Sequence, residues 1–247
     1  VIDLEARKLT RATVTRVATV AALVLVMATT AGGYTAAMHA GDTDLGRKAA
    51  SMVTSPGWDG YTALGATSVS VTMLLAVGVV MSWSTGREFI DGTVVGLFAI
   101  PSRLGIIAAA KMAVVLTWAT ILGAVEAGAL TTAGLLLGLG PEGAAGCCTT
   151  LMLVAALLGA SVLPVMWAAT RWRGYLAGIG LTLVILVVAN LAAGFGLGSY
   201  VPWSVPIVWV SHQTEVSTPL LATPVMTAAI GAWVTLRSWD RLQLGTD

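Results

Sequence analysis

Long apolar runs separated by short polar stretches dominate the chain. Six of these runs exceed the length of about 20 residues that an α-helix needs to cross roughly 30 Å of hydrocarbon. The runs do not show the alternating pattern of membrane β-strands. The sequence therefore predicts an all-α, polytopic membrane helical bundle, a single transmembrane domain over 1–247, with six transmembrane helices at 14–37, 61–84, 105–139, 148–170, 174–198 and 217–236.

Composition supports the assignment to the membrane. Hydrophobic residues make up 57% of the chain and charged residues only 10%, whereas soluble domains are about 25% charged. The lipid bilayer is therefore one expected partner. The sequence has no basic patch with interleaved aromatic residues, so we expect no nucleic-acid partner.

Lysine and arginine residues divide unevenly between the two sides of this predicted topology. Arg47 and Lys48 fall on one side, and the other eleven fall on the side of the termini. Because basic residues accumulate in cytoplasmic loops, the division predicts cytoplasmic termini and a multi-pass protein of the plasma (inner) membrane. The eleven are Arg7, Lys8, Arg11, Arg16, Arg87, Arg103, Lys111, Arg171, Arg173, Arg237 and Arg241.

The segment 199–216, before the last predicted helix, combines prolines with aromatic residues on the extracellular side. Tyr200, Trp203 and Trp209 alternate there with Pro202 and Pro206. Aromatic residues are typical of the membrane interface, and prolines break a helix where neighbours can satisfy the backbone. Two interpretations stay open, a loop at the interface and a re-entrant segment that dips into the bundle.

The sequence lacks the motifs of several enzyme classes. Lys8, Lys48 and Lys111 are the only lysines, and none follows a glycine, so no GxxxxGK[ST] phosphate-binding loop is present. The only histidines are His39 and His212, which form no HExxH zinc motif. We therefore expect no catalytic residues, no metal site and no cofactor bound by this chain.

Two polar residues lie deep within predicted membrane helices. Glu126 is about 22 Å beyond Lys111 along a helix, and Asn190 follows Gly174 at a similar spacing. An intramembrane carboxylate costs roughly 2.5 to 3.5 kcal/mol to insert and normally faces a cavity or a partner. Glu126 and Asn190 are therefore candidates for a substrate pathway. The alternative for Glu126 is a protonated carboxyl that hydrogen-bonds between helices.

A charged stretch separates the second and third predicted helices. Thr85 and Glu88 have the spacing of a helix-capping box, and Arg87 with Asp91 has the spacing of an i,i+4 ion pair. Pro101 marks a break before the next helix. The pattern predicts a short amphipathic helix with exposed charges on the cytoplasmic side. It also fits a helix that lies on the membrane surface without a partner.

These residues resemble those of the permease (transmembrane) subunits of type 2 ABC exporters. That family has six membrane helices, a basic amphipathic N-terminal helix, and a cytoplasmic segment with a glutamate, a Gly-Thr pair and a Pro-x-Arg sequence. The matching residues here are Glu88, Gly92 with Thr93, and Pro101 with Arg103. The basic sequence within 4–16 is similar to the N-terminal helix, which is expected over 1–13.

The resemblance implies an energy-coupling role for the segment 85–103. It implies that this segment contacts an ATP-binding cassette subunit, present in two copies, with ATP and Mg on that partner. A second permease subunit, identical or related, would complete the pathway, and 199–216 would hold a re-entrant element. The implied coupling residues are Arg87, Glu88, Asp91, Gly92, Thr93, Pro101 and Arg103.

The expected function is ATP-driven efflux of a hydrophobic or amphipathic molecule, with a drug or a peptide antibiotic favoured. The apolar walls suit such a substrate better than a bare ion, which would need clustered carboxylates or carbonyls. Two alternatives remain. One is an intramembrane lipid-modifying enzyme that uses Glu126 with His212 or Glu215. The other is a noncatalytic membrane scaffold.

Overall fold

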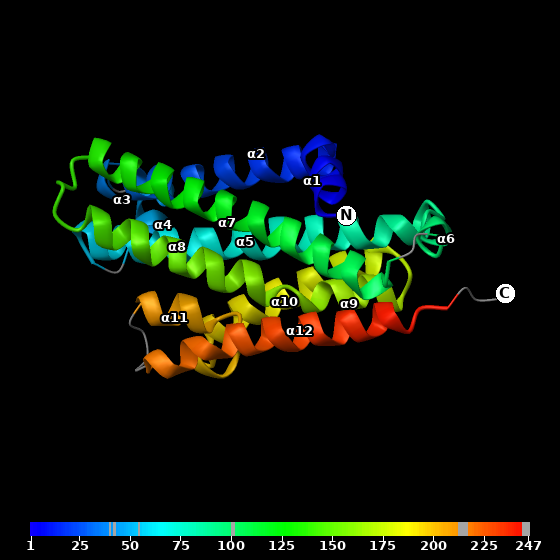
Figure 1. Cartoon of the computed structure of the whole chain (residues 1–247). Coiled ribbons are helices and arrows are strands. Elements are labelled where there is room, and N and C mark those ends of the chain that lie inside the picture. Colours follow the sequence, from blue (N-terminus) through cyan, green and yellow to red (C-terminus); the bar gives the residue numbers. More distant parts are fainter. Residues whose placement is uncertain (40, 42, 54, 100–101, 212–216, 244–247) are drawn as a thin grey trace.

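In the computed structural model, long helices run back and forth along one axis (Figure 1). The structure describes the whole chain except residues 40, 42, 54, 100–101, 212–216 and 244–247. Within the described residues all regular secondary structure is helical. This confirms the predicted fold class.

In the part of the chain that the structure describes, six helical stretches are long and apolar enough to cross a membrane, so the predicted number is confirmed. Their ends differ from the prediction by several residues, most of all in the second, which starts earlier and ends later. The stretches are Thr13–His39, Gly57–Ile90, Leu104–Leu136, Ala144–Arg171, Tyr175–Gly194 and Thr218–Asp240.

Three of these stretches are single α-helices and three are interrupted. The second, third and fifth are α5 (Gly57–Ile90), α7 (Leu104–Leu136) and α10 (Tyr175–Gly194). The first stretch consists of α2 (Thr13–Met27), a π-turn at Ala28–Gly32 and α3 (Gly33–His39). The fourth consists of α8 (Ala144–Ser161) and α9 (Pro164–Arg171). The sixth consists of a 3-10 turn at Thr218–Leu221 and α12 (Ala222–Asp240). Proline at the start of α9 explains one interruption, because its ring disrupts a continuous helix.

The chain begins with α1 (Ile2–Arg11), which crosses the bundle axis instead of following it (Figure 1). Ala12 has an extended backbone and separates α1 from α2. Asp3 and Glu5 lie in the first turn of α1, and Lys8 and Arg11 in its last turn, which favours this helix electrostatically. The break at Ala12 lets α1 turn sideways across the ends of α2 and α7.

The two ends of the bundle differ in charge. One end, called the basic end below, carries α1, the small helix α6 (Val94–Leu97) and the last turn of α12 (Figure 1). The eleven lysines and arginines assigned to the side of the termini all belong to segments at or near this end. Arg47 and Lys48 lie on α4 (Asp44–Met52), at the opposite end. The structure thus preserves the charge division along the bundle axis.

Small residues bring α5 and α10 into close contact. A Cβ atom added at Gly86 would lie 2.1 Å from the backbone nitrogen of Tyr175, and one at Gly78 would lie 2.4 Å from the Thr182 side chain. Such distances require glycine at both positions. Close backbone approach through small residues is typical of helix packing in membranes, where apolar burial alone drives little association.

The segment 198–211, which follows α10, folds back onto the bundle. It contains a 3-10 turn at Gly198–Tyr200 and α11 (Val205–Ser211), whose residues Val205 to Val208 are buried. The Trp203 indole donates a hydrogen bond to the carbonyl of Ser161 at 3.1 Å, and the Ser204 hydroxyl donates to that of Ala189 at 2.7 Å. Ser161 ends α8, well inside the fourth membrane stretch.

Candidate functional site

The charged stretch 85–103 differs from the predicted amphipathic helix. The helix α5 continues unbroken to Ile90, so Thr85 lies inside it and is buried. The predicted capping box of Thr85 and Glu88 is therefore wrong, because such a box forms only at a helix N-terminus. Thr85 and Glu88 have the spacing of a capping box, but the helix formed by the preceding apolar run continues past both residues.

The chain leaves α5 at Asp91 and Gly92. Gly92 has a φ of +68°, a left-handed conformation that glycine adopts without the strain other residues incur, and it ends the helix. After Thr93 the single turn of α6 follows, and Arg103 precedes α7 directly. Pro101 lies outside the described residues. Residues 91–98 form an exposed projection at the basic end, which we call the tip segment.

The ion pair between Arg87 and Asp91 is present, as predicted. Its Nε and Oδ2 atoms are 2.9 Å apart, and both side chains are about half exposed, at 49% and 47%. The guanidinium of Arg87 also lies over the Trp83 ring, 5.1 Å from its centre. Exposed pairs of this kind add little stability. Because both side chains are exposed, their charges are accessible to a partner.

Glu88 points inward, contrary to the expectation that its charge is exposed. Its side chain is only 8% exposed. The reason is that Glu88 faces α1 and α7, each of which supplies a lysine, and a buried carboxylate is stabilised when cations surround it. The described residues of the predicted coupling set thus separate into the buried Glu88 and five exposed residues, Arg87, Asp91, Gly92, Thr93 and Arg103.

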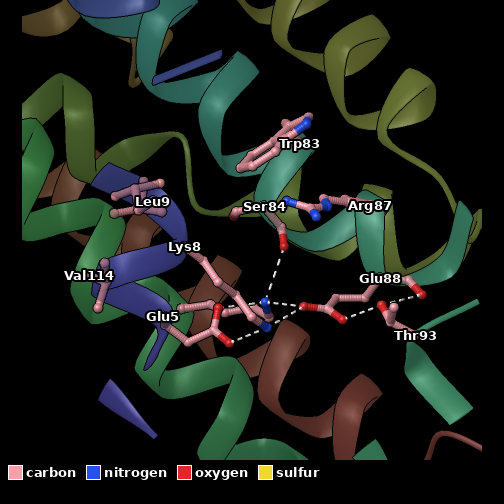
Figure 2. Close-up of a pocket in the computed structure, with 11 residues that line it drawn as sticks. Glu5, Lys8, Leu9, Trp83, Ser84, Arg87, Glu88, Thr93 and Val114 are labelled. Atoms are coloured by element: carbon pink, nitrogen blue, oxygen red, sulfur yellow. Dashed lines mark hydrogen bonds and ion pairs between the residues drawn. The ribbon is translucent and has the colours of Figure 1, made fainter. Parts of the chain in front are cut away.

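Four charged side chains from three helices form a buried ionic cluster (Figure 2). The Nζ atom of Lys111 is 2.8 Å from Oε1 of Glu88 and 2.7 Å from Oε2 of Glu5. The Nζ atom of Lys8 is 3.1 Å from the same Glu88 oxygen and 3.0 Å from Oε1 of Glu5. Lys111 also donates to the carbonyl of Ser84 at 3.2 Å. Two carboxylates and two ammonium groups balance one another, which offsets the cost of their burial.

The second oxygen of Glu88 connects the cluster to the tip segment. The Thr93 hydroxyl donates a hydrogen bond to Oε2 of Glu88 at 2.6 Å (Figure 2). Glu88 therefore bonds to α7 and α1 through one oxygen and to the residue after Gly92 through the other. Through this single side chain the tip segment is joined to α1 and to the first turns of the membrane helix α7.

Lys8 occupies the outer edge of the cluster. Burial by itself lowers the pKa of its ammonium group, but the carboxylates of Glu5 and Glu88 outweigh this effect and raise the pKa above its usual value. Lys8 therefore carries its charge at neutral pH. The cavity beside the cluster measures about 110 Å³, room for a few water molecules but too small for a drug-sized substrate.

Glu126 and Asn190 do not meet. Glu126 on α7 is completely buried, and its Oε2 accepts a hydrogen bond from the Thr72 hydroxyl of α5 at 3.3 Å, while Oε1 has no partner in the described part of the chain. Asn190 is exposed on α10 and donates to the carbonyl of Leu186 within its own helix at 2.8 Å. His212 and Glu215, named for the enzyme alternative, lie outside the described residues.

Sequence reasoning did not include Glu5, Lys8 and Lys111 among the site residues. One signal was available, because Lys111 lies inside a long apolar run and a buried lysine requires a carboxylate partner. The identity of that partner depends on how α1 crosses α7, and local sequence patterns do not determine this. The N-terminal helix was expected only as a basic surface element.

The structure and the sequence pattern agree with a comparison to known families. The family model described as ABC-2 family transporter protein matches residues 1–189, which include the N-terminal helix, the ionic cluster and the tip segment. The chain belongs to this family. None of the curated proteins matches it. The ABC-2 assignment makes the chain a multi-pass permease subunit of an ABC transporter, a class of transporter that works with an ATP-binding partner.

For this permease, the family assignment confirms the resemblance read from Glu88, the Gly92–Thr93 pair and the six apolar runs. The match ends at residue 189, before α11 and α12. The segments at the basic end that precede the fourth membrane stretch are therefore all inside the matched region.

Proposed function

We propose that this permease couples ATP hydrolysis by a separate ATP-binding cassette subunit to efflux of a hydrophobic or amphipathic molecule. The sequence has no phosphate-binding loop of its own, so such a cycle needs an external ATPase. The proposal places the basic end in the cytoplasm of a plasma (inner) membrane, as the lysine and arginine division favours.

The observation that carries the proposal is the apolar surface of the tip segment. Val95 and Phe98 are 57% and 38% exposed, and Ile90 at the end of α5 is 52% exposed, although all three lie at the basic end of the bundle. Exposed apolar side chains rimmed by charges are typical of a protein interface. The proposed partner surface consists of these side chains with Arg87 and Asp91.

In this scheme Glu88 acts behind the interface. It joins the tip segment to α1 and α7, so a movement of the tip caused by the ATPase is passed to two elements of the bundle. Buried ionic clusters have discrete arrangements, which suits a two-state rearrangement. Glu88 is thus a positioning residue, while Arg87 and Asp91 contact the partner.

A co-purification experiment tests the partner. The tagged permease is purified in mild detergent from its own host, and its associated ATP-binding cassette protein is identified and counted by mass spectrometry. We expect two ATP-binding subunits for two permease subunits, and loss of most of the ATPase with Val95→Asp or Phe98→Asp. Met52→Asp, at an equally exposed apolar residue on α4 at the opposite end, is the control. Retention of the ATPase by both tip variants contradicts the proposal.

The proposed substrate path lies along α2 and α5. A groove of about 340 Å³ between these helices is lined by small and apolar side chains, with hydroxyl groups only from Thr13 and Thr72. Such walls suit a drug or a hydrophobic peptide antibiotic. One permease provides one wall, and a second permease, identical or related, would provide the other.

Glu126 stands directly behind this groove, because its hydrogen-bond donor Thr72 lines it. We expect Glu126→Gln to fold like the wild type, since it keeps the side-chain volume. It should change the pH profile or substrate range of export, because it removes the Glu126 carboxyl group behind the groove. The measurement is ATP-dependent drug uptake into inverted membrane vesicles, which corresponds to export from the cell, between pH 5 and 8. An unchanged profile would assign Glu126 a packing role alone. Asn190→Ala serves as the comparison, at an exposed residue of α10 that is not among those lining the groove.

A further inference from the structure

A larger cavity lies between α1, α2 and α7, beside the ionic cluster. It measures about 660 Å³ and extends from α1 toward the middle of the bundle. Its lining on α7 runs from Ala113 to Val125, which is about 18 Å at 1.5 Å per residue. The cavity is therefore an elongated groove that follows the direction of the membrane helices.

The groove has an apolar part and a polar end. Leu23, Ile121 and Val125 line the part farther from α1, and Ile121 and Val125 are 59% and 48% exposed. Exposed apolar side chains on a membrane helix face lipid, so the groove opens sideways toward the bilayer. At the other end, Thr10 of α1 and Arg16 of α2 line the groove.

This polar end has unused binding capacity. The guanidinium of Arg16 is exposed, and its one hydrogen bond within the described chain goes from Nε to the carbonyl of Thr10, at 3.4 Å. None of the ion pairs formed by the described residues includes Arg16. Thr15 lines the same end and is only 5% exposed, and its hydroxyl has no hydrogen-bond partner among the residues that the structure describes.

We propose that the groove binds one anionic phospholipid, with its phosphate at Arg16 and one acyl chain along Leu23, Ile121 and Val125. A single cation at one end of a long apolar groove, at the end of a membrane helix, matches the charge and shape of a lipid headgroup and tail. A protein helix in the same groove would leave the guanidinium without an anion unless an acidic residue happened to face it. The proposal does not depend on the transported substrate.

Bound lipid would also support the ionic cluster. Leu9 on α1 and Val114 on α7 line both the groove and the cavity beside the cluster. An acyl chain packed in the groove therefore contacts both α1 and α7 next to the cluster. The lipid is thus placed to stabilise the element that contributes two of the four charges.

The test is native mass spectrometry of the detergent-purified permease titrated with phosphatidylglycerol or phosphatidylcholine. We expect one phosphatidylglycerol to bind more tightly than phosphatidylcholine, and Arg16→Gln to weaken phosphatidylglycerol binding about fivefold, the effect of one basic residue on anionic lipid. Arg171→Gln, an exposed arginine at the same end but outside the groove, should leave binding unchanged. Equal binding of both lipids by the wild type would overturn the proposal, as would an equal loss in the two variants.

A second pair of variants tests the position of the acyl chain. Thr117 and Thr120 are both exposed on α7, and each hydroxyl bonds to the carbonyl four residues earlier, but only Thr117 lines the groove. Thr117→Phe should fill the groove and abolish the single tight lipid, whereas Thr120→Phe should retain it. Thermal unfolding of each variant checks that it is folded. If delipidated wild type instead dimerises and Thr117→Phe is monomeric, a second copy occupies the groove and the proposal is wrong.

Discussion

At the scale of single residues, Glu88 combines three connections in one side chain. One oxygen contacts the lysines of α1 and α7, and the other accepts a hydrogen bond from Thr93. Because the cluster is neutral as a whole, removal of the charge of Glu88 or Lys111 leaves an uncompensated charge in a buried site. Breaking a buried ion pair in this way costs about 3–5 kcal/mol, more than the pair itself contributes.

This asymmetry predicts the outcome of a double-mutant cycle on Glu88 and Lys111. Glu88→Gln and Lys111→Met should each lower the free energy of unfolding by about 3 kcal/mol, because each leaves one excess buried charge. The double variant should recover most of the loss, since Glu5 and Lys8 remain as a balanced pair. Urea or thermal unfolding in detergent measures the cycle. Additive losses would show that the two charges do not interact.

Lys8 makes the stability of the cluster depend on pH. Its pKa is raised in the folded protein, so its contribution to stability is fully present below its unfolded value of about 10.5 and is lost as pH rises through the higher folded value. We expect proteolysis at Arg7 or Arg11 in α1 to accelerate over that alkaline range. In Lys8→Met, cleavage should already be faster at neutral pH and should vary less as the pH rises. The expected effect is small, because the Lys8 side chain is 38% exposed and solvent screens it.

At the scale of helices, α5 and α10 depend on glycine at the points of closest approach. A Cβ at Gly86 would meet backbone atoms of Tyr175. Backbone atoms within a helix cannot rotate aside as the end of a flexible side chain can. We expect Gly86→Ala to destabilise the protein by about 1–3 kcal/mol through overpacking. Gly180→Ala on α10 is the control, because a Cβ there has no neighbour within 4 Å. Thermal unfolding in detergent compares them, and equal stability of the two variants would contradict this packing argument.

The helices themselves were predictable, whereas their junctions were not. An apolar run of more than 20 residues determines a membrane helix whatever surrounds it, so all six were found. The capping-box spacing of Thr85 and Glu88 also occurs inside a continuous helix, and it led to a helix start that does not exist. The true end of α5 depends on the left-handed turn at Gly92, one of many glycines in the sequence.

The candidate site was predictable as a location but not as an arrangement. Charges in a chain with so few of them indicated the segment after the second helix. Whether Glu88 faces outward or inward depends on Lys8 and Lys111, which are 80 and 23 residues away. Lys8 reaches Glu88 because Ala12 turns α1 across the bundle, and Lys111 reaches it from α7, which packs beside α5. Long-range geometry of this kind is set by packing, not by local spacing.

At the scale of the whole molecule, the charge division along the bundle axis predicts the orientation in the membrane. The basic end carries the tip segment, and an ATP-binding subunit is available only in the cytoplasm. The proposed coupling therefore requires this end to be cytoplasmic, in agreement with the positive-inside rule. Glu142, in the exposed turn between α7 and α8, would then be extracellular, and Arg171, at the end of α9, cytoplasmic.

Cysteine labelling in intact cells tests that orientation. In a background where Cys147 and Cys148 are replaced by serine, single cysteines are introduced as Glu142→Cys or Arg171→Cys, both at exposed positions. A membrane-impermeant maleimide should label the first variant in intact cells and the second only after permeabilisation. The reverse pattern would place the tip segment outside the cell, beyond the reach of any ATP-binding subunit. The proposed energy source would then be excluded, while the helical bundle and its ionic cluster would stand unchanged.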